Sequence, residues 1–87
     1  MYIILCYDVR SERNDKILKT ARKYLHSTQR SVLEGHLTAA QISRLKEELS
    51  RMIDPQEDSV RIFMAESSDR IEINQIGKTA GTFNGFL

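Results

Sequence analysis

An aspartate that ends the first apolar run is the residue of this chain best placed for chemistry. Residues 2–7, YIILCY, are almost unbroken in hydrophobicity, and Asp8 follows them directly. A carboxylate at the carboxyl end of a buried strand is often a ligand or a catalytic group in α/β architectures. The plainer alternative is a cap or turn residue for the helix expected near Glu12, and position alone leaves both interpretations open.

Basic residues are concentrated directly after this aspartate. Residues 10–30 contain seven basic and two acidic residues, a net charge of +5, whereas the rest of the chain holds six basic and ten acidic residues, a net charge of −4. This asymmetry indicates a local contact with a polyanion, although a solvated helix face gives the same pattern. The candidate contacts with nucleic acid are Arg10, Arg13, Lys16, Lys19, Lys23 and Arg30.

A carboxylate beside clustered cations suits a metal-assisted reaction on a phosphodiester. Mg²⁺, with Mn²⁺ as a substitute, binds through one or two carboxylates, several waters and phosphate oxygens. Such a metal activates water and stabilises developing charge, while basic side chains hold the phosphate backbone. One carboxylate in each chain is a meagre site, and a symmetric dimer would double it. We therefore predict Asp8 as both metal ligand and catalytic residue.

Strands and helices must alternate to position these residues. The contiguous apolar residues 2–7 predict a strand buried on both faces. Apolar residues at helical spacing predict a helix over about 12–25, with Ser11 as its cap. Residues 28–37 are extended, as one bent strand or two short ones, and Gly35 suggests a bulge or bend.

The second half of the chain repeats this alternation. Residues 38–41, TAAQ, form a capping-box pattern that opens a second helix, which ends before Pro55. Residues 59–65 alternate as a strand, with Val60, Ile62 and Met64 on one face and Arg61 and Phe63 on the other. Ile71 and Ile73 mark a further strand.

This order of elements predicts an α+β fold of ferredoxin-like type, a βαββαβ two-layer sandwich with an extra C-terminal strand. Residues 1–76 form the domain, and residues 77–87 are a tail that docks on a partner or is a disordered end. A chain of 87 residues has a thin core, for which oligomerisation is a common remedy. The lack of a long apolar run argues against a membrane span, and the single cysteine favours the cytoplasm.

Three segments resemble the CRISPR-associated protein 2 family. They are MYIILCYDV at residues 1–9, STQRSVLEGHLT at 27–38 and DSVRIFMAE at 58–66. The pattern Q-x-S-V-x-E-G within the second segment is the most specific of the three. Leu33 stands where the family often has phenylalanine. The family commonly has arginines at the start of the first helix; the closest matches here are Arg10, Arg13 and Lys16, and Asn14 and Asp15 interrupt the pattern.

The resemblance implies a ferredoxin-like protomer in a symmetric homodimer, with Asp8 of both protomers at the dimer axis sharing a divalent metal. It implies a metal-dependent endonuclease of single-stranded RNA or double-stranded DNA. It also implies a role in spacer acquisition, where the dimer bridges two dimers of the CRISPR-associated integrase in a heterohexameric or similar complex. Residues 77–87 would then add a strand to the partner's sheet or contact the integrase.

Three alternatives remain open from the sequence. A purely structural adaptor between integrase dimers shares every feature with the enzyme. A toxin-type endoribonuclease on a similar small fold is the second alternative. A ferredoxin-like regulatory domain that binds a small molecule is the third, and it does not predict the +5 segment at residues 10–30.

Overall fold

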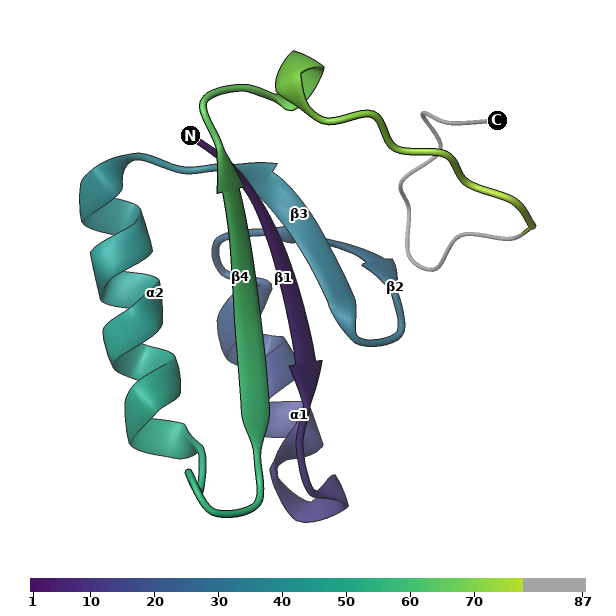
Figure 1. Ribbon diagram of the computed structural model, residues 1–87. Helices are drawn as coiled ribbons and strands as arrows, with labels where there is room; N and C mark the ends of the chain where they lie inside the picture. Colours follow the sequence, from purple (N-terminus) through teal and green to yellow (C-terminus); the bar gives the residue numbers. More distant parts are fainter. Residues whose placement is uncertain (78–87) are drawn as a thin grey trace.

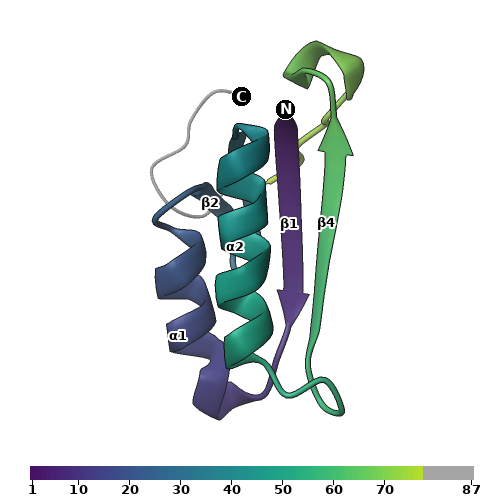
Figure 2. The ribbon, with the colours of Figure 1, turned by 90° about the vertical axis from the view of Figure 1, so that its left-hand side faces the viewer.

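Four antiparallel strands form one sheet, and both helices pack against the same face of it (Figure 1, Figure 2). The computed structural model describes residues 1–77. The strand order is β2-β3-β1-β4, which is the ferredoxin-like arrangement and confirms the predicted fold class. The elements are β1 (Tyr2–Asp8), α1 (Ser11–Ala21), β2 (His26–Gln29), β3 (Val32–His36), α2 (Ala39–Met52), β4 (Ser59–Ala65) and the 3₁₀ turn η1 (Ser68–Arg70).

The central strand β1 turns one row of side chains into the core. Ile3, Leu5 and Tyr7 are buried beneath the two helices, where they meet Ile17 of α1 and Leu45 of α2. The alternate side chains of β1 lie on the other face, which no helix covers, and there Ile4 and Cys6 are half-buried. The prediction that this strand is buried on both faces is therefore wrong for the single chain.

The first helix begins and ends differently from its prediction. Ser11 is its first residue, and Arg10 holds the cap position in extended backbone without a side-chain cap. The helix ends at Ala21, because the following amides bond in tighter turns that bring Leu25 into the core. The periodicity of residues 12–25 therefore marked the buried face correctly and the helix end wrongly.

Residues 28–37 belong to two strands, β2 and β3, joined by a turn at Arg30 and Ser31. The irregularity in their pairing falls between Ser27 and Gln29 rather than at Gly35. Gly35 is instead a point of close approach, since a Cβ there would lie 3.1 Å from Leu25 Cδ2. The absence of a side chain at Gly35 leaves room for Leu25, the residue directly before β2.

The helix α2 starts as its sequence predicted. The Thr38 hydroxyl accepts a hydrogen bond from the Gln41 amide, and the Gln41 side chain accepts one from the Thr38 amide, so the capping box is complete. The strand β4 also follows its predicted alternation: Val60 and Ile62 pack against the core, and Phe63 lies on the opposite face.

The chain after β4 forms no further strand within the described part. The turn η1 comes first, and residues 73–75 then lie beside the sheet face that the helices leave open, where Ile73 lies near Ile4 and Val32. The strand predicted at Ile71 and Ile73 is therefore absent, because this segment lies across the sheet instead of pairing along its edge. Apart from its first residue, the predicted tail 77–87 lies outside the described residues. In residues 1–77 no helix is long and apolar enough to span a membrane.

Candidate functional site

Asp8 is the last residue of β1, and its side chain is exposed. Pairing with Ser59 places it on the sheet face opposite the helices, in the same row as Ile4 and Cys6. Its carboxylate has no hydrogen bond or ion pair with any residue from 1 to 77. The strand therefore presents a hard, negatively charged oxygen ligand at the edge of an otherwise apolar row.

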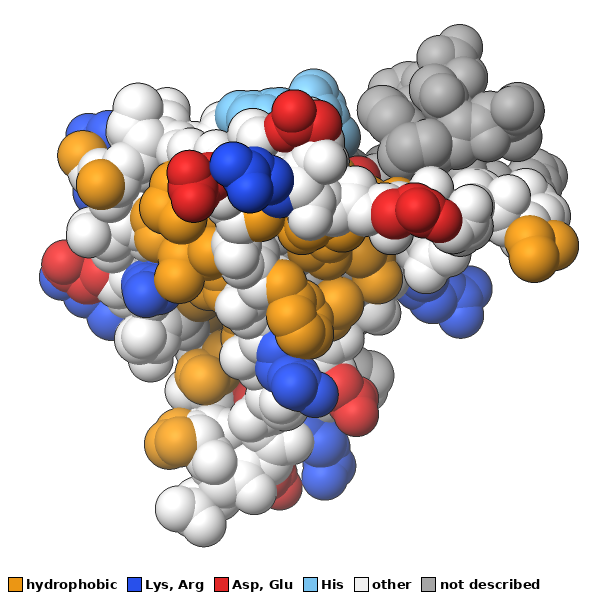
Figure 3. Space-filling model, turned by 45° about the horizontal axis from the view of Figure 1, so that its top comes forward, with side chains coloured by type: hydrophobic (Ala, Val, Ile, Leu, Met, Phe, Trp, Pro, Cys, Tyr) orange, Lys and Arg blue, Asp and Glu red, His pale blue; other side chains and the backbone are white. Residues whose placement is uncertain are grey.

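The sheet face around Asp8 is largely apolar, and we call it the open face. It contains Ile4 and Cys6 of β1, Val32 of β3 and Phe63 of β4, and Phe63 is 44% exposed. Hydrophobic side chains gather in the middle of the view in Figure 3, with the histidines at its rim. The Arg61 guanidinium stacks on the Phe63 ring at 5.2 Å from its centroid, which adds a cation to this face.

The turn between β2 and β3 brings Arg30 to the chain that follows Asp8. The Tyr7 amide donates to the Ser31 carbonyl at 3.1 Å, so this turn is fastened beside the end of β1. A surface hollow lies next to it, lined by Val9, Ser11, Asn14, Asp15 and Arg30. Arg30 and the first turn of α1 thus share one hollow, although 20 residues separate Arg30 from Arg10.

The remaining basic residues fall into two groups. The side chains of Lys16, Lys19 and Arg30 are exposed and make no hydrogen bond or ion pair within the described residues, although the Arg30 carbonyl accepts from the Tyr7 hydroxyl. Lys23 lies beyond the end of α1 and donates to Glu48 of α2 at 2.5 Å. The contacts of these residues with nucleic acid remain predictions, and the unpaired cations are the ones free to make them.

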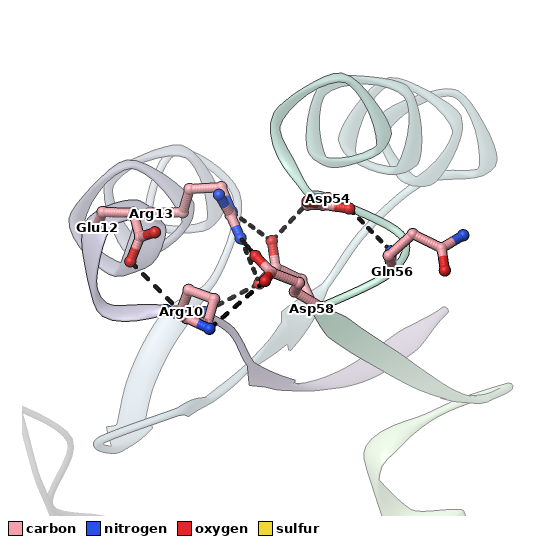
Figure 4. A network of polar contacts seen from close by, with 7 residues as sticks. Arg10, Glu12, Arg13, Asp54, Gln56 and Asp58 are labelled. Atoms are coloured by element: carbon pink, nitrogen blue, oxygen red, sulfur yellow. Dashed lines mark hydrogen bonds and ion pairs between the residues drawn. The ribbon is translucent and has the colours of Figure 1, made fainter.

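Arg10 and Arg13 belong to a network with the start of β4 (Figure 4). The Arg13 guanidinium donates to Asp58 from Nε at 2.5 Å and from Nη2 at 3.1 Å, and to Glu57 at 3.2 Å. The Arg10 side chain lies 3.5 Å from Glu57 and 3.9 Å from Glu12. Arg13 therefore has a structural role in the protein besides its predicted role in binding nucleic acid.

These contacts set the charge state of the network. The Arg13 hydrogen bonds, with smaller contributions from the Asp54 and Arg10 amides, hold the pKa of Asp58 well below its usual range. The same hydrogen bond to Asp58 raises the pKa of Arg13. Elsewhere, the Lys23 and Tyr24 hydrogen bonds lower the pKa of Glu48. Asp58 is therefore an anion at every pH at which the protein is ordinarily studied.

The described residues contain no group of three or more His, Cys, Asp or Glu side chains that could hold a metal ion. Asp8 is the available ligand at the strand end; the open face also carries Cys6 and Arg61 and, farther from Asp8, His36 and Glu34, which accepts a hydrogen bond from the Tyr2 hydroxyl. A divalent metal at Asp8 would need ligands from solvent, nucleic acid or a second chain.

Asp58 is the residue that sequence reasoning missed. In the sequence it stands out only as the first residue of the segment DSVRIFMAE, and it lies 45 residues from Arg13. No local spacing links two such residues. The available signal was weak: an aspartate directly before a strand whose partner strand ends on Asp8.

Comparisons with known proteins agree on one family. The model of the family described as CRISPR associated protein Cas2 matches residues 1–72. A protein named CRISPR-associated endoribonuclease Cas2 from Thermotoga maritima is 46% identical over 87 residues, which cover 100% of this chain and 99% of that protein. A protein of the same name from Frankia alni is 40% identical and covers 100% of both chains.

Solved structures are also similar. A crystal structure of Cas2 has a TM-score of 0.86 and 31% identity, and the match covers 100% of this chain and 98% of that chain. The crystal structure of Streptococcus pyogenes Cas2 at pH 6.5 has a TM-score of 0.73 and 28% identity, with 86% of this chain and 100% of that chain covered. Family model, relatives along the full length and solved structures together show that this chain belongs to the Cas2 family of CRISPR-associated proteins.

Proposed function

We propose that this protein is a metal-dependent endoribonuclease of CRISPR adaptation and that Asp8 is its metal ligand and catalytic residue. The observation that carries the proposal is the exposed Asp8 carboxylate, which has no partner within residues 1–77. The relatives that align along the whole chain are named endoribonucleases. Their names favour this function over the scaffold, toxin-type and small-molecule alternatives.

The proposed active form is a homodimer that packs through the open face. A one-sided sheet leaves half-buried apolar side chains in contact with water, and a second copy would cover them. Because Asp8 lies in the same row of β1 as Ile4 and Cys6, a two-fold axis near the end of β1 brings two copies of Asp8 together. The dimer thus supplies the second carboxylate that the single chain lacks.

The residues fit Mg²⁺ or Mn²⁺ better than a softer metal. Carboxylate oxygens with waters and phosphate oxygens are the ligands that Mg²⁺ prefers, and two copies of Asp8 give the one or two carboxylates it needs. When bound, the ion would lower the pKa of a water and stabilise charge on the phosphate. Asp8 of each chain would hold the ion, and Arg30, Lys16 and Lys19 would bind the RNA backbone on either side of the reacting phosphate.

Cleavage assays with Asp8→Ala test this function. We expect the purified wild-type protein to cleave single-stranded RNA only with added Mg²⁺ or Mn²⁺. Asp8→Ala should reduce cleavage to background, because the metal loses its protein ligand. Activity should also fall at acid pH, since a carboxylate binds metal only when ionised. Duplex DNA in parallel reactions establishes the substrate preference.

The control is Asp69→Ala, which removes an exposed aspartate beyond the other end of the sheet. It should cleave at the wild-type rate, and all three proteins should sediment as the same species. Full wild-type activity in chelator, or normal cleavage by Asp8→Ala, would contradict the proposal.

We also propose contact with the CRISPR-associated integrase. In this role the dimer bridges two integrase dimers and supports the DNA to be inserted, a role that requires no metal. The support is membership of the Cas2 family, together with the outer edge of β4, which pairs with no strand of residues 1–77. Co-purification with the integrase from the same cells tests this partner, and failure to co-purify at micromolar concentrations would count against it.

A further inference from the structure

We propose that Asp58 is a positioning residue for Asp8: it fixes the strand end that carries the Asp8 carboxylate and thereby sets the metal affinity of the site. The inference rests on the function proposed above. It goes further by assigning a role to a buried residue that cannot itself touch metal or RNA.

The strand end at Asp8 is held mainly from one side. Pairing of β1 with β3 ends at Cys6 opposite Val32, followed by one hydrogen bond from the Tyr7 amide to the Ser31 carbonyl, whereas pairing with β4 continues to Asp8 opposite Ser59. The position of Asp8 therefore depends on where β4 begins. Asp58 is the residue directly before that point.

The Asp58 carboxylate is surrounded by four donors, and its side chain is 0% exposed. Oδ1 accepts from the Arg10 amide at 2.9 Å and from Arg13 Nη2 at 3.1 Å. Oδ2 accepts from Arg13 Nε at 2.5 Å and from the Asp54 amide at 2.8 Å. Figure 4 shows these groups converging on Asp58 from the first helix and from the loop before β4.

One of these contacts and the adjacent strand pair both reach the chain around Asp8. Arg10 lies two residues after Asp8, and its amide is tied to Asp58, while Ser59 next to Asp58 pairs with Asp8 itself. Glu57 contacts only the exposed ends of Arg10 and Arg13, so it cannot replace the backbone contacts. Loss of the Asp58 carboxylate would free the segment between β1 and α1, and Asp8 would lose its fixed direction.

A second cluster offers a matched control. Glu48 of α2 accepts hydrogen bonds from Lys23 and Tyr24, so it also joins two distant parts of the chain through a carboxylate. These partners lie at the far end of α1, away from the end of β1. Glu48→Gln therefore weakens a comparable tertiary contact without touching the strand end that carries Asp8.

The test is a titration of the full-length dimer with Mn²⁺, in which free Mn²⁺ is measured by electron paramagnetic resonance. Asp58→Asn should raise the dissociation constant at least about tenfold, in the range seen when outer contacts of a metal ligand are lost. The Mn²⁺ concentration that half-saturates RNA cleavage should rise by the same factor. Glu48→Gln should leave both quantities within about twofold of wild type.

Asp58→Glu keeps the proposal testable if Asp58→Asn does not fold. It retains the ion pair with Arg13 but displaces the carboxylate by one methylene from the Arg10 and Asp54 amides. We expect a folded protein that still binds Mn²⁺ at least about fivefold more weakly than wild type. Wild-type Mn²⁺ affinity in Asp58→Glu would show that charge pairing suffices and would overturn the positioning role.

Two further outcomes separate this inference from the proposed function. If the wild-type protein binds Mn²⁺ through Asp8 and Asp58→Asn binds it equally well, only the positioning role fails. If the wild-type protein shows no Mn²⁺ binding that is lost in Asp8→Ala, both the metal-dependent function and the positioning role are wrong.

Discussion

Asp58 comes directly before Ser59, the residue that pairs with Asp8 in the sheet. The carboxylates of Asp8 and Asp58 nevertheless have opposite environments. Asp8 is exposed and unpaired among the described residues, whereas Asp58 is buried and accepts four hydrogen bonds. An exposed carboxylate is available to a ligand, and a buried, fully bonded one is available only to the fold. In the proposed site, Asp8 binds the metal and Asp58 holds the strand end that carries Asp8.

The low pKa of Asp58 predicts a specific loss of stability in acid. The unfolded chain has the higher pKa, about 3.9, so the contribution of Asp58 is complete above that pH. It is lost as pH falls below about 4 towards the pKa of the folded protein. Urea unfolding midpoints measured between pH 6 and pH 2 should fall less steeply for Asp58→Asn than for wild type. Parallel profiles for the two proteins would contradict this.

The sequence allowed Asp8 to be predicted and Asp58 to be missed for a physical reason. Asp8 stands out because a charge interrupts an apolar run, which is a local pattern. The partners of Asp58 are Arg10, Arg13 and Asp54, and two of these lie more than 40 residues away. Only the folded chain brings them within hydrogen-bonding distance.

At the scale of elements, α1 and the turn after it carry cations, of which some are ion-paired and some are not. Lys16 and Lys19 have no polar partner among residues 1–77, but Arg13 is held by Asp58 and Lys23 by Glu48. An ion-paired cation must break its contact before it binds a phosphate. The free lysines of α1 are therefore the better candidates for RNA contacts.

Salt-dependent binding of single-stranded RNA tests that assignment. Each phosphate contact on a single strand contributes ~0.7 to the slope of log K against log salt concentration. The double variant Lys16→Gln with Lys19→Gln should therefore reduce the slope by about 1.4. Lys46→Gln removes an exposed cation from α2 and should leave the slope unchanged. Equal slopes for the double variant and wild type would remove both lysines from the interface.

The elements differ in how far local sequence determines their ends. The α2 capping box needs only Thr38 and Gln41, and it formed as predicted. The cap predicted at Ser11 did not form, since Asp58 holds the Arg10 amide from another part of the chain. The alternation at Ile71 and Ile73 resembled a strand. A strand must also pair with the edge of a neighbouring strand, and residues 71–77 form no such pair.

At the scale of the whole molecule, the open face leaves apolar side chains partly exposed within residues 1–77. A sheet with both helices on one side needs a cover for the other side, and residues 73–75 cover only the part near β2 and β3. Phe63 and the end of β1 lie towards the β4 edge, outside that cover. The proposed dimer would bury this part.

Phe63→Asp tests the dimer interface. Burial of one phenylalanine side chain stabilises an interface by about 1.5–3 kcal/mol. Both copies of a symmetric dimer lose it, so the dimer dissociation constant should rise about 100-fold or more. Ala40→Asp places the same charge on the exposed surface of α2 and should leave the dimer intact. Sedimentation velocity over a range of concentrations measures both. An unchanged dimer in Phe63→Asp would move the interface elsewhere.

The pairing of β1 with β4 also has a consequence for the order in which the protein is made. The strand that carries Asp8 leaves the ribosome well before its partner β4, which begins only at Ser59. Non-local strand pairs form late because a long loop must close first. During synthesis, Asp8 and the apolar side chains of β1 therefore lack their neighbouring strand until β4 has been made. The site is among the last parts of the fold to form.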